Sequence, residues 1–266
     1  MKIGFIGCGN MATAMLKGIL KSGEVKNGDM IASAKSDKTR EKIEKELGIQ
    51  KADTNAQVVD FADVVFLAVK PQFLEEVLDE IKDNVKEGQI FISIAPGKTL
   101  QWLGEHLGEG TKIIRTMPNT PAMVGEGMSG VSYDENLFTD EEKQVIDGFF
   151  TSFGKMEKVD EKLMDVVGSA SGCSPAYVYM FIEALADGCV KNGLPRQMAY
   201  RMAAQAVLGS AKMVLETGKH PGELKDMVCS PGGTTIEGVA ALEEGGFRSS
   251  IIKACDANYE KNKRLK

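Results

Sequence analysis

The chain has 266 residues, of which 43% are hydrophobic and 26% charged, and a formal net charge of −6 at pH 7. A chain of this size can bury a substantial core, in one large domain or two ordinary ones. The negative charge argues against nucleic acid or an anionic membrane surface as partner. The sequence contains no run of roughly 18 uncharged apolar residues, so we expect no membrane-spanning segment. The cysteines show neither close pairing nor metal-ligand spacing, so we expect no metal site and reduced thiols in a cytoplasmic protein without a signal peptide.

The chain opens with a dinucleotide-binding pattern. An apolar strand at 3–6 runs into Gly7-x-Gly9-x-x-Ala12, and a helical pattern follows to residue 22. Gly7 permits a tight turn, Gly9 leaves room for a pyrophosphate, and Ala12 still allows the helix to pack closely on the strand. The alternative is a plain turn between a strand and a helix.

The second strand, expected at 30–33, indicates which dinucleotide binds. An NAD enzyme usually places Asp or Glu at its end to hold the ribose hydroxyls. Here Ser33 and Lys35 occupy this position, and Arg40 follows one turn into the next helix. Hydroxyls and cations suit a 2′-phosphate, so we expect NADPH, with NADH as the alternative. A solvated helix start explains the cations equally well.

Strands and helices alternate through the first part of the chain, which predicts parallel strands joined by crossover helices. The expected strands are 3–6, 30–33, 63–69, 90–95 and 112–116, with helices at 10–22, 37–47 and 72–85. A strand at 130–133, a helix at 139–153 and a strand at 155–159 follow, and helical spacing dominates afterwards. The sequence therefore predicts an α/β protein, with an N-terminal Rossmann domain over 1–160 and an all-α domain over 161–266.

Several loops follow the carboxyl ends of predicted strands, where ligands bind in open α/β sheets. Lys70 precedes Pro71 and could face the cofactor, or could be an exposed lysine at a helix start. The segment 93–97 could pass its backbone along the nicotinamide ring. Asn119 lies between two prolines that stiffen its loop, although turn chemistry alone also explains this composition.

The helical domain carries three further features. The Gly/Ser-rich stretch 168–175 would offer unpaired N–H groups and hydroxyls to an anion. The helix after it, 176–193, is apolar nearly all round, which predicts burial that includes a partner subunit. Near the end of the chain, a Pro-Gly-Gly turn at 231–233 leads into Thr234 and Thr235, in the first turn of a helix whose N–H groups favour a carboxylate. An ordinary Ser/Thr-capped helix is the alternative here.

Taken together, these motifs resemble the pyrroline-5-carboxylate reductase family, and the resemblance runs essentially from end to end. It implies reduction of an imine acid to proline by hydride from NADPH or NADH, the last step of proline biosynthesis. It also implies a homodimer that interlocks through the helical domains, often within a larger ring, with the substrate site completed across the dimer. The segments that carry it are Gly7–Ala12, Ala68–Pro71, Arg115–Pro121, Ser171–Tyr177, Ala184–Pro195 and, most specifically, Ser230–Glu243.

By this resemblance, Thr235 is the catalytic residue, through a hydrogen bond or relayed proton to the ring nitrogen. A basic imine can arrive partly protonated, so positioning and desolvation would supply most of the catalysis. The expected substrate-binding residues are Ser230, Gly232, Gly233, Thr234, Thr235 and Asn119. The expected cofactor-binding residues are Ile6, Gly7, Cys8, Gly9, Asn10, Met11, Ser33, Lys35, Asn55, Ala68, Val69, Lys70, Ala95 and Glu161. Thr234 departs from the Ala that many relatives carry.

Three alternatives stay open. A β-hydroxyacid dehydrogenase shares the architecture but needs a catalytic Lys early in the second domain, and the segment 169–179 has none. A non-enzymatic NADP-sensing protein would not need the Pro-Gly-Gly-Thr-Thr loop. A reductase for a six-membered imine is harder to separate, because one methylene gives only about 1–3 kcal/mol of discrimination.

Overall fold

The computed structural model describes residues 1–23 and 25–264, and its contacts divide the chain into two compact units. The first, called here the sheet unit, holds residues 1–173 together with the chain from Asn258 onward. The second, the helical unit, is Ser174–Ala257. The division by contacts thus falls after residue 173, and the domain boundary at 160 stays a prediction.

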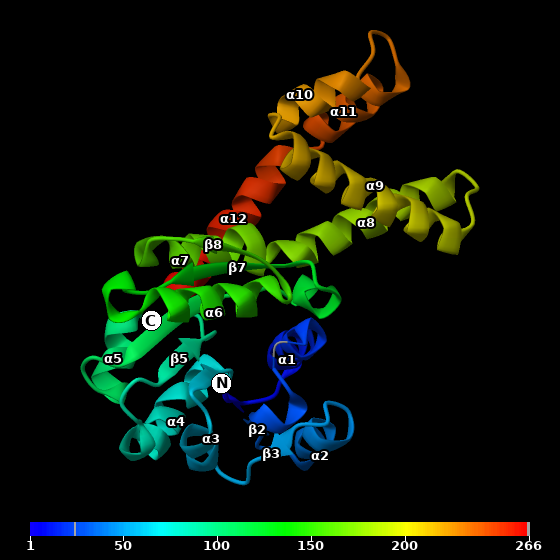
Figure 1. The fold of residues 1–266 in the computed structure, drawn as a ribbon. Coiled ribbons are helices and arrows are strands. Elements are labelled where there is room, and N and C mark those ends of the chain that lie inside the picture. Colours follow the sequence, from blue (N-terminus) through cyan, green and yellow to red (C-terminus); the bar gives the residue numbers. More distant parts are fainter. Residues whose placement is uncertain (24, 265–266) are drawn as a thin grey trace. The chain divides into compact units, whose positions relative to one another are not determined.

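The described part of the sheet unit contains one eight-stranded sheet of order β3-β2-β1-β4-β5-β6-β7-β8 (Figure 1). The first six strands of this order run parallel to their neighbours, whereas β7 is antiparallel to β6 and β8 is parallel to β7. The strands are β1 (Ile3–Ile6), β2 (Met30–Ser33), β3 (Gln50–Lys51), β4 (Val64–Leu67), β5 (Ile90–Ser93), β6 (Lys112–Met117), β7 (Gly127–Ser132) and β8 (Gly154–Lys158).

Helices cover both faces of this sheet. Side chains of α1, α2 and α6 share one buried cluster with Ile3 and Phe5, and side chains of α3, α4 and α5 share the other with Ile6. Alternate residues of β1 therefore point into different cores, as expected for a parallel strand buried on both faces. The helices of this unit are α1 (Asn10–Ser22), α2 (Asp37–Lys45), α3 (Asn55–Phe61), α4 (Leu74–Ile81), α5 (Leu100–Leu107), α6 (Asp140–Thr151) and α7 (Met164–Val167).

Short turns of 3₁₀ helix connect several of these elements. Pro71 begins one of them directly after β4, and Thr120 begins another after β6, so both predicted loops at strand ends turn at their prolines. The 3₁₀ segments are η1 (Asn27–Asp29), η2 (Pro71–Phe73), η3 (Lys82–Asn84), η4 (Thr120–Val124), η5 (Glu135–Leu137) and η6 (Glu161–Leu163).

The predicted fold class is confirmed, with differences in detail. The sequence missed β3, α3 and α5, and it predicted no direction for the strand at 130–133, which the structure shows as β7, antiparallel to β6. This reversal follows from η4, because a five-residue 3₁₀ turn is too short for a crossover helix and sends the chain straight back along β6.

The Gly/Ser stretch at the end of the sheet unit is helical, which corrects the expectation of free N–H groups there. Residues Gly168–Gly172 form a π-helical turn, η7, closed by a bond of 2.8 Å from the Cys173 N–H to the Gly168 carbonyl. The Ser171 hydroxyl donates to the Val167 carbonyl, and the Ser169 hydroxyl donates to the Asn258 side chain. These groups hold the segment together instead of facing an anion.

The helical unit is built from α8 to α11 and most of α12, and α8 packs against α9. The chain turns between them at Gly193, whose φ is +98°. None of the helices in the described ranges combines the length and apolar character that crossing a bilayer requires. The bounds are α8 (Ser174–Lys191), α9 (Arg196–Thr217), α10 (Pro221–Val228), α11 (Thr234–Glu244) and α12 (Phe247–Lys263).

Candidate functional site

The glycine loop between β1 and α1 forms the floor of the first candidate site. Gly7 adopts φ +92°, and a β-carbon there would lie 2.7 Å from the Ala68 carbonyl oxygen, so only glycine fits. A β-carbon at Gly9 would meet no atom within 4 Å, so space is open beside this residue. Gly9 caps α1 without a side-chain hydrogen bond, which leaves the first N–H groups of α1 able to bind an anion.

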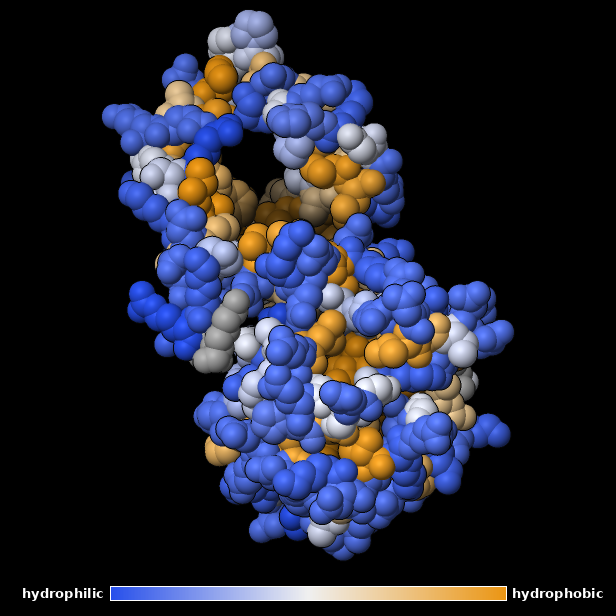
Figure 2. All heavy atoms as spheres, turned by 90° about the vertical axis from the view of Figure 1, so that its left-hand side faces the viewer, coloured by the Kyte–Doolittle hydropathy of each residue, from blue (hydrophilic) through white to orange (hydrophobic). Residues whose placement is uncertain are grey.

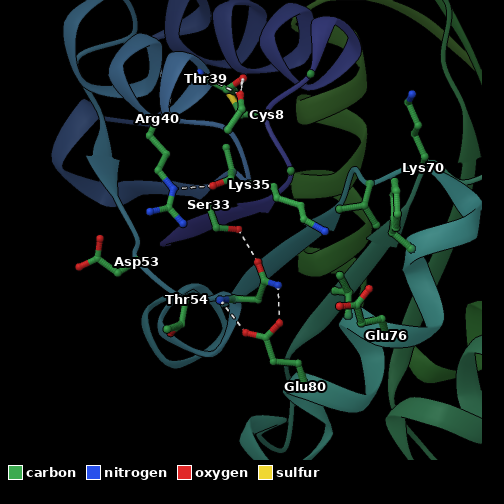
Figure 3. Close-up of a pocket in the computed structure, with 18 residues that line it drawn as sticks. Cys8, Ser33, Lys35, Thr39, Arg40, Asp53, Thr54, Lys70, Glu76 and Glu80 are labelled. Carbon is green, nitrogen blue, oxygen red and sulfur yellow. Dashed lines mark hydrogen bonds between the residues drawn. The ribbon is translucent and has the colours of Figure 1, made fainter.

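A cavity of about 820 Å³ opens beside this loop, at the carboxyl ends of β1 and β2 (Figure 3). Eight of the predicted cofactor residues line it: Gly7, Cys8, Gly9, Ser33, Lys35, Asn55, Val69 and Lys70. Residues that the predicted set did not include also line it: Ala34, Ser36, Thr39, Arg40, Asp53, Thr54, Phe73, Glu76, Val77 and Glu80.

Two cations stand on the wall formed by the end of β2 and the start of α2. The Arg40 Nε donates to the Ala34 carbonyl at 2.7 Å, which holds the guanidinium beside the strand end. The Lys35 ammonium lies 5.3 Å from the centre of the Phe73 ring. Both cations fit a phosphate group.

A chain of three hydrogen-bonded side chains forms another wall, marked by dashed lines in Figure 3. The Ser33 hydroxyl donates to Asn55 Oδ1 at 2.6 Å, and Asn55 Nδ2 donates to Glu80 Oε2 at 2.7 Å. The backbone N–H of Asn55 donates to the other oxygen of Glu80, at 3.2 Å. Glu80 reaches this wall from α4, so an acidic group is present in the cavity although none stands at the end of β2.

The residues around the cavity fit a nicotinamide dinucleotide. Free N–H groups at the start of α1 and the open space beside Gly9 suit a pyrophosphate. The cavity also offers hydroxyl, amide and carboxylate groups for a ribose at the end of β2, together with the cations Lys35 and Arg40 for a 2′-phosphate.

Cys8 lies in the glycine loop but is a poor nucleophile. Its side chain is 4% exposed, and its sulfur lies 3.9 Å from the Thr13 hydroxyl. Burial raises the pKa of the Cys8 thiol, although the Thr13 hydrogen bond and the charge of Lys42 oppose the shift. The thiol is therefore protonated at neutral pH and acts as a small packing group.

The other predicted cofactor residues do not line this cavity. Ile6 and Ala95 are buried in the core, at 0% and 2% exposure. Ala68 presents its carbonyl to the Gly7 turn, Asn10 lines a smaller neighbouring pocket, and Met11 stands in the first turn of α1. Their proposed contacts with the cofactor stay predictions.

Glu161 and Asn119 have structural partners within the sheet unit. Glu161 Oε1 accepts the Leu100 N–H at 2.6 Å and a bond from the buried Arg115 at 3.3 Å. The Asn119 amide donates to the Ser171 carbonyl at 3.1 Å and accepts the Met128 N–H at 2.9 Å. Asn119 is only 7% exposed, so it braces the loop after β6, and its predicted contact with substrate stays a prediction.

The second candidate site is the loop between α10 and α11 in the helical unit. The Gly233 N–H donates to the Ser230 carbonyl at 3.0 Å, and Gly232 adopts φ +66°. Gly233 caps α11 without a side-chain hydrogen bond, and α11 begins with Thr234 and Thr235, as predicted. A β-carbon at Gly233 would lie 2.4 Å from Ser230 Oγ, so glycine keeps this hydroxyl against the helix start. Uncapped N–H groups beside exposed hydroxyls suit a carboxylate.

The helical unit exposes an extensive apolar surface, visible as orange atoms in the upper part of Figure 2. On α8, Met180 is 68% exposed and Tyr179 59%, whereas Ala186 is buried. A groove of about 1000 Å³ runs along α8 and the start of α12, lined by residues that include Phe181, Leu185 and Ile251. Isolated apolar residues are common on protein surfaces, whereas a continuous apolar groove of this size is typical of an interaction site.

No sequence pattern predicted Asp53, Glu76 or Glu80 in the cavity. Helical spacing places Glu76 and Glu80 on one face of α4, but it does not reveal that this face borders the end of β2. Thr54 could have been found, because a Thr three residues before Gln57 is a helix-start signature, and its side chain does accept the Gln57 N–H.

Comparison with known proteins identifies relatives of both units. Residues 161–265 match the family described as "Pyrroline-5-carboxylate reductase dimerisation", and residues 2–97 match "NADP oxidoreductase coenzyme F420-dependent". A pyrroline-5-carboxylate reductase of Escherichia coli is 49% identical over 264 residues, which cover 99% of this chain and 98% of that one.

Solved structures agree with these matches. A pyrroline carboxylate reductase of Plasmodium falciparum with NADP bound has a TM-score of 0.89 at 34% identity, covering 100% of this chain and 98% of its own. The 1-pyrroline-5-carboxylate reductase of Streptococcus pyogenes has a TM-score of 0.89 at 35% identity, covering 99% and 98%.

Proposed function

Because the chain belongs to the pyrroline-5-carboxylate reductase family, we propose that it reduces 1-pyrroline-5-carboxylate to L-proline with NADPH or NADH. The observation that carries this proposal is the 49% identity to a named reductase over 99% of the chain. We further propose a cytoplasmic protein in which residues 1–160 bind the cofactor and 161–266 bind substrate and partner. The bound dinucleotide supplies the hydride.

The residues of the sheet unit bind and orient the dinucleotide. The N–H groups at the start of α1 hold its pyrophosphate, with Gly7, Cys8, Gly9, Asn10 and Met11 forming the turn around it. Ser33, Lys35 and Asn55 hold the adenosine ribose and its 2′-substituent. Ile6, Ala68, Val69, Lys70, Ala95 and Glu161 complete the proposed set along the strand ends.

The loop before α11 binds the substrate and polarises its imine. Ser230, Gly232, Gly233 and Thr234 offer hydroxyl and N–H groups to the carboxylate, and Asn119 completes the proposed set. The Thr235 hydroxyl hydrogen-bonds the ring nitrogen: its oxygen accepts the N–H of the protonated imine, or it donates or relays a proton to the neutral imine, and both favour the electron-poor imine carbon that accepts hydride. The reaction needs little proton transfer from the protein, because this imine is basic enough to bind partly protonated.

Thr235→Val tests the catalytic assignment, because valine keeps the shape of the side chain and removes its hydroxyl. Loss of a hydrogen bond to a charged group corresponds to a decrease in kcat of about ten- to a hundredfold. The assay follows oxidation of NADPH, then NADH, with pyrroline-5-carboxylate, and detects proline. Thr235→Ser is the matched control and keeps most of the activity, and NADPH affinity stays normal in both variants. An unchanged kcat in Thr235→Val removes the residue from the mechanism.

We also propose a homodimer through the helical unit, with a larger ring built from such dimers. The exposed apolar face of α8 and the adjoining groove support this, because a second copy of the chain would remove both from water. Met180→Glu places a charge on that face, and we expect it to lower the mass measured by light scattering on a sizing column. Lys191→Glu, at the end of the same helix, is the control for charge alone. An unchanged mass in Met180→Glu contradicts the proposed interface.

A further inference from the structure

The hydrogen bonds of Ser33, Asn55 and Glu80 have a fixed direction. An ionised Glu80 can only accept hydrogen bonds, so the amide nitrogen of Asn55 must face it, as the 2.7 Å bond shows. The amide oxygen of Asn55 then faces Ser33 and also can only accept. The Ser33 proton is therefore directed to Asn55, at 2.6 Å, and the Ser33 oxygen presents lone pairs to the cavity.

This direction distinguishes two ligands by their chemistry. A ribose 2′-hydroxyl can donate a hydrogen bond to the Ser33 oxygen, whereas the oxygens of a 2′-phosphate dianion only accept. To donate to a phosphate, Ser33 would have to leave Asn55 and deprive the amide oxygen of its bond. Lys35 and Arg40 favour the phosphate on the adjoining wall, so the cavity combines groups suited to either ligand.

We propose that Glu80 is a positioning residue that sets the balance between NADPH and NADH, by fixing the Asn55 amide and thereby the Ser33 proton. This proposal rests on the proposed use of a nicotinamide dinucleotide, and it adds a residue of α4 to those that determine the preference for NADPH or NADH. Glu80 favours the unphosphorylated ribose and moderates the preference for NADPH that the cations create.

Glu80→Gln tests this proposal with little change in shape. Glutamine can donate as well as accept, so Asn55 is no longer held in one orientation. When its amide turns, its nitrogen faces Ser33 and the Ser33 proton becomes available to the cavity. We expect the ratio of the Kd for NAD⁺ to the Kd for NADP⁺ to rise about three- to tenfold, a modest change because Glu80 is exposed. Isothermal titration calorimetry measures both constants on the full chain without substrate.

Glu76→Gln is the matched control. Glu76 lies one turn earlier on α4 and lines the same cavity, so its loss removes the same charge without removing a bond to Asn55. We expect the control to raise the ratio by less than half as much as Glu80→Gln does. In a Ser33→Ala background, Glu80→Gln should change the ratio only as much as the control, because there is no hydroxyl proton to redirect.

Three results would overturn the proposal: an unchanged ratio in Glu80→Gln, an equal rise in Glu76→Gln, or a full effect that persists in Ser33→Ala. The second result would mean that charge alone sets the preference. Failure of the proposed function is distinguishable, because it appears as binding of neither dinucleotide by the unsubstituted chain, or as binding without proline formation. Binding of neither overturns both proposals, whereas binding without turnover leaves the ratio measurable.

Discussion

Gly7 and Gly9 stand two residues apart in the same loop, and the structure predicts opposite consequences for replacing them by alanine. At Gly9 the backbone is extended, with φ −73° and ψ −170°, and a β-carbon meets nothing within 4 Å. Alanine fits this conformation, and reduced freedom of the unfolded chain would stabilise the protein by about 0.4–1 kcal/mol. Alanine is also a poorer helix cap than glycine, by about 0.5–1 kcal/mol, so the two effects nearly cancel.

Gly7→Ala combines two costs. The φ of +92° is strained for alanine by about 1–3 kcal/mol, and the β-carbon would lie 2.7 Å from a backbone oxygen that cannot move without displacing the end of β4. A loss near 3 kcal/mol corresponds to a decrease in Tm of about 6–12 °C for a unit of this size. Gly9→Ala should change Tm by less than about 2 °C.

NADP⁺ affinity should be reduced by the substitution that leaves stability unchanged, Gly9→Ala. The open space beside Gly9 is where the pyrophosphate is proposed to bind, so Gly9→Ala should weaken NADP⁺ binding at least tenfold in a protein of normal stability. Thermal unfolding by circular dichroism and calorimetric titration with NADP⁺ separate the two effects. A Gly9→Ala variant that binds NADP⁺ normally, or that melts as low as Gly7→Ala, would refute the reasoning from the two glycines.

Three further predictions concern other parts of the chain. Arg115→Met removes the buried cation that bonds the carboxylates of Glu161 and Asp165, and should lower the free energy of unfolding by about 3–5 kcal/mol in urea denaturation. Lys162→Met, at the exposed ion pair with Asp160, is the control and should leave the urea midpoint unchanged. Gly233→Ala should raise the KM for pyrroline-5-carboxylate, because its β-carbon would lie 2.4 Å from the Ser230 hydroxyl oxygen and 3.1 Å from the Ser230 carbonyl oxygen. Its φ of −81° is unstrained, so Tm should fall less than in Gly7→Ala, and an unchanged KM would contradict the proposed carboxylate site. Burial raises the pKa of the Cys8 thiol above its ordinary 9.0, so the folded chain holds this proton more tightly than the unfolded chain and loses stability as pH rises above 9. Cys8→Ala should reduce this loss, measured as the free energy of unfolding between pH 8 and pH 11.

Local patterns predicted the glycine loop and α1 correctly because everything that fixes them lies within about twenty residues. The apolar strand, the turn glycines and the helical spacing are adjacent in the chain, and they agree with one another. The two-residue strand β3 and the seven-residue helix α3 were missed, because a single strand period or fewer than two helical turns is too short to establish either pattern.

The wall of the cavity could not be predicted, because its residues meet only after the sheet has formed. Ser33 and Asn55 are 22 residues apart, and Asn55 and Glu80 are 25 apart, on three different elements. The end of β2 therefore suggested a site without acidic groups, while the carboxylate comes from α4. Strand direction has the same limitation, since the pattern of β7 is the same whether it runs parallel or antiparallel to β6.

The α8 helix shows a different relation between sequence and structure. Its residues are apolar nearly all round, which predicts a buried helix, yet in the single chain most of them are exposed and Ala186 is buried. Exposed methionine, tyrosine and phenylalanine in one helix cost solubility, unless another surface covers them. The match of 161–265 to a dimerisation family and the groove beside α8 both support the homodimer proposed above. In the proposed dimer, the apolar pattern of α8 is that of a buried helix. The same reasoning applies to Thr234 and Thr235, which are exposed residues in this structure, because a hydroxyl polarises a substrate more strongly where water is excluded.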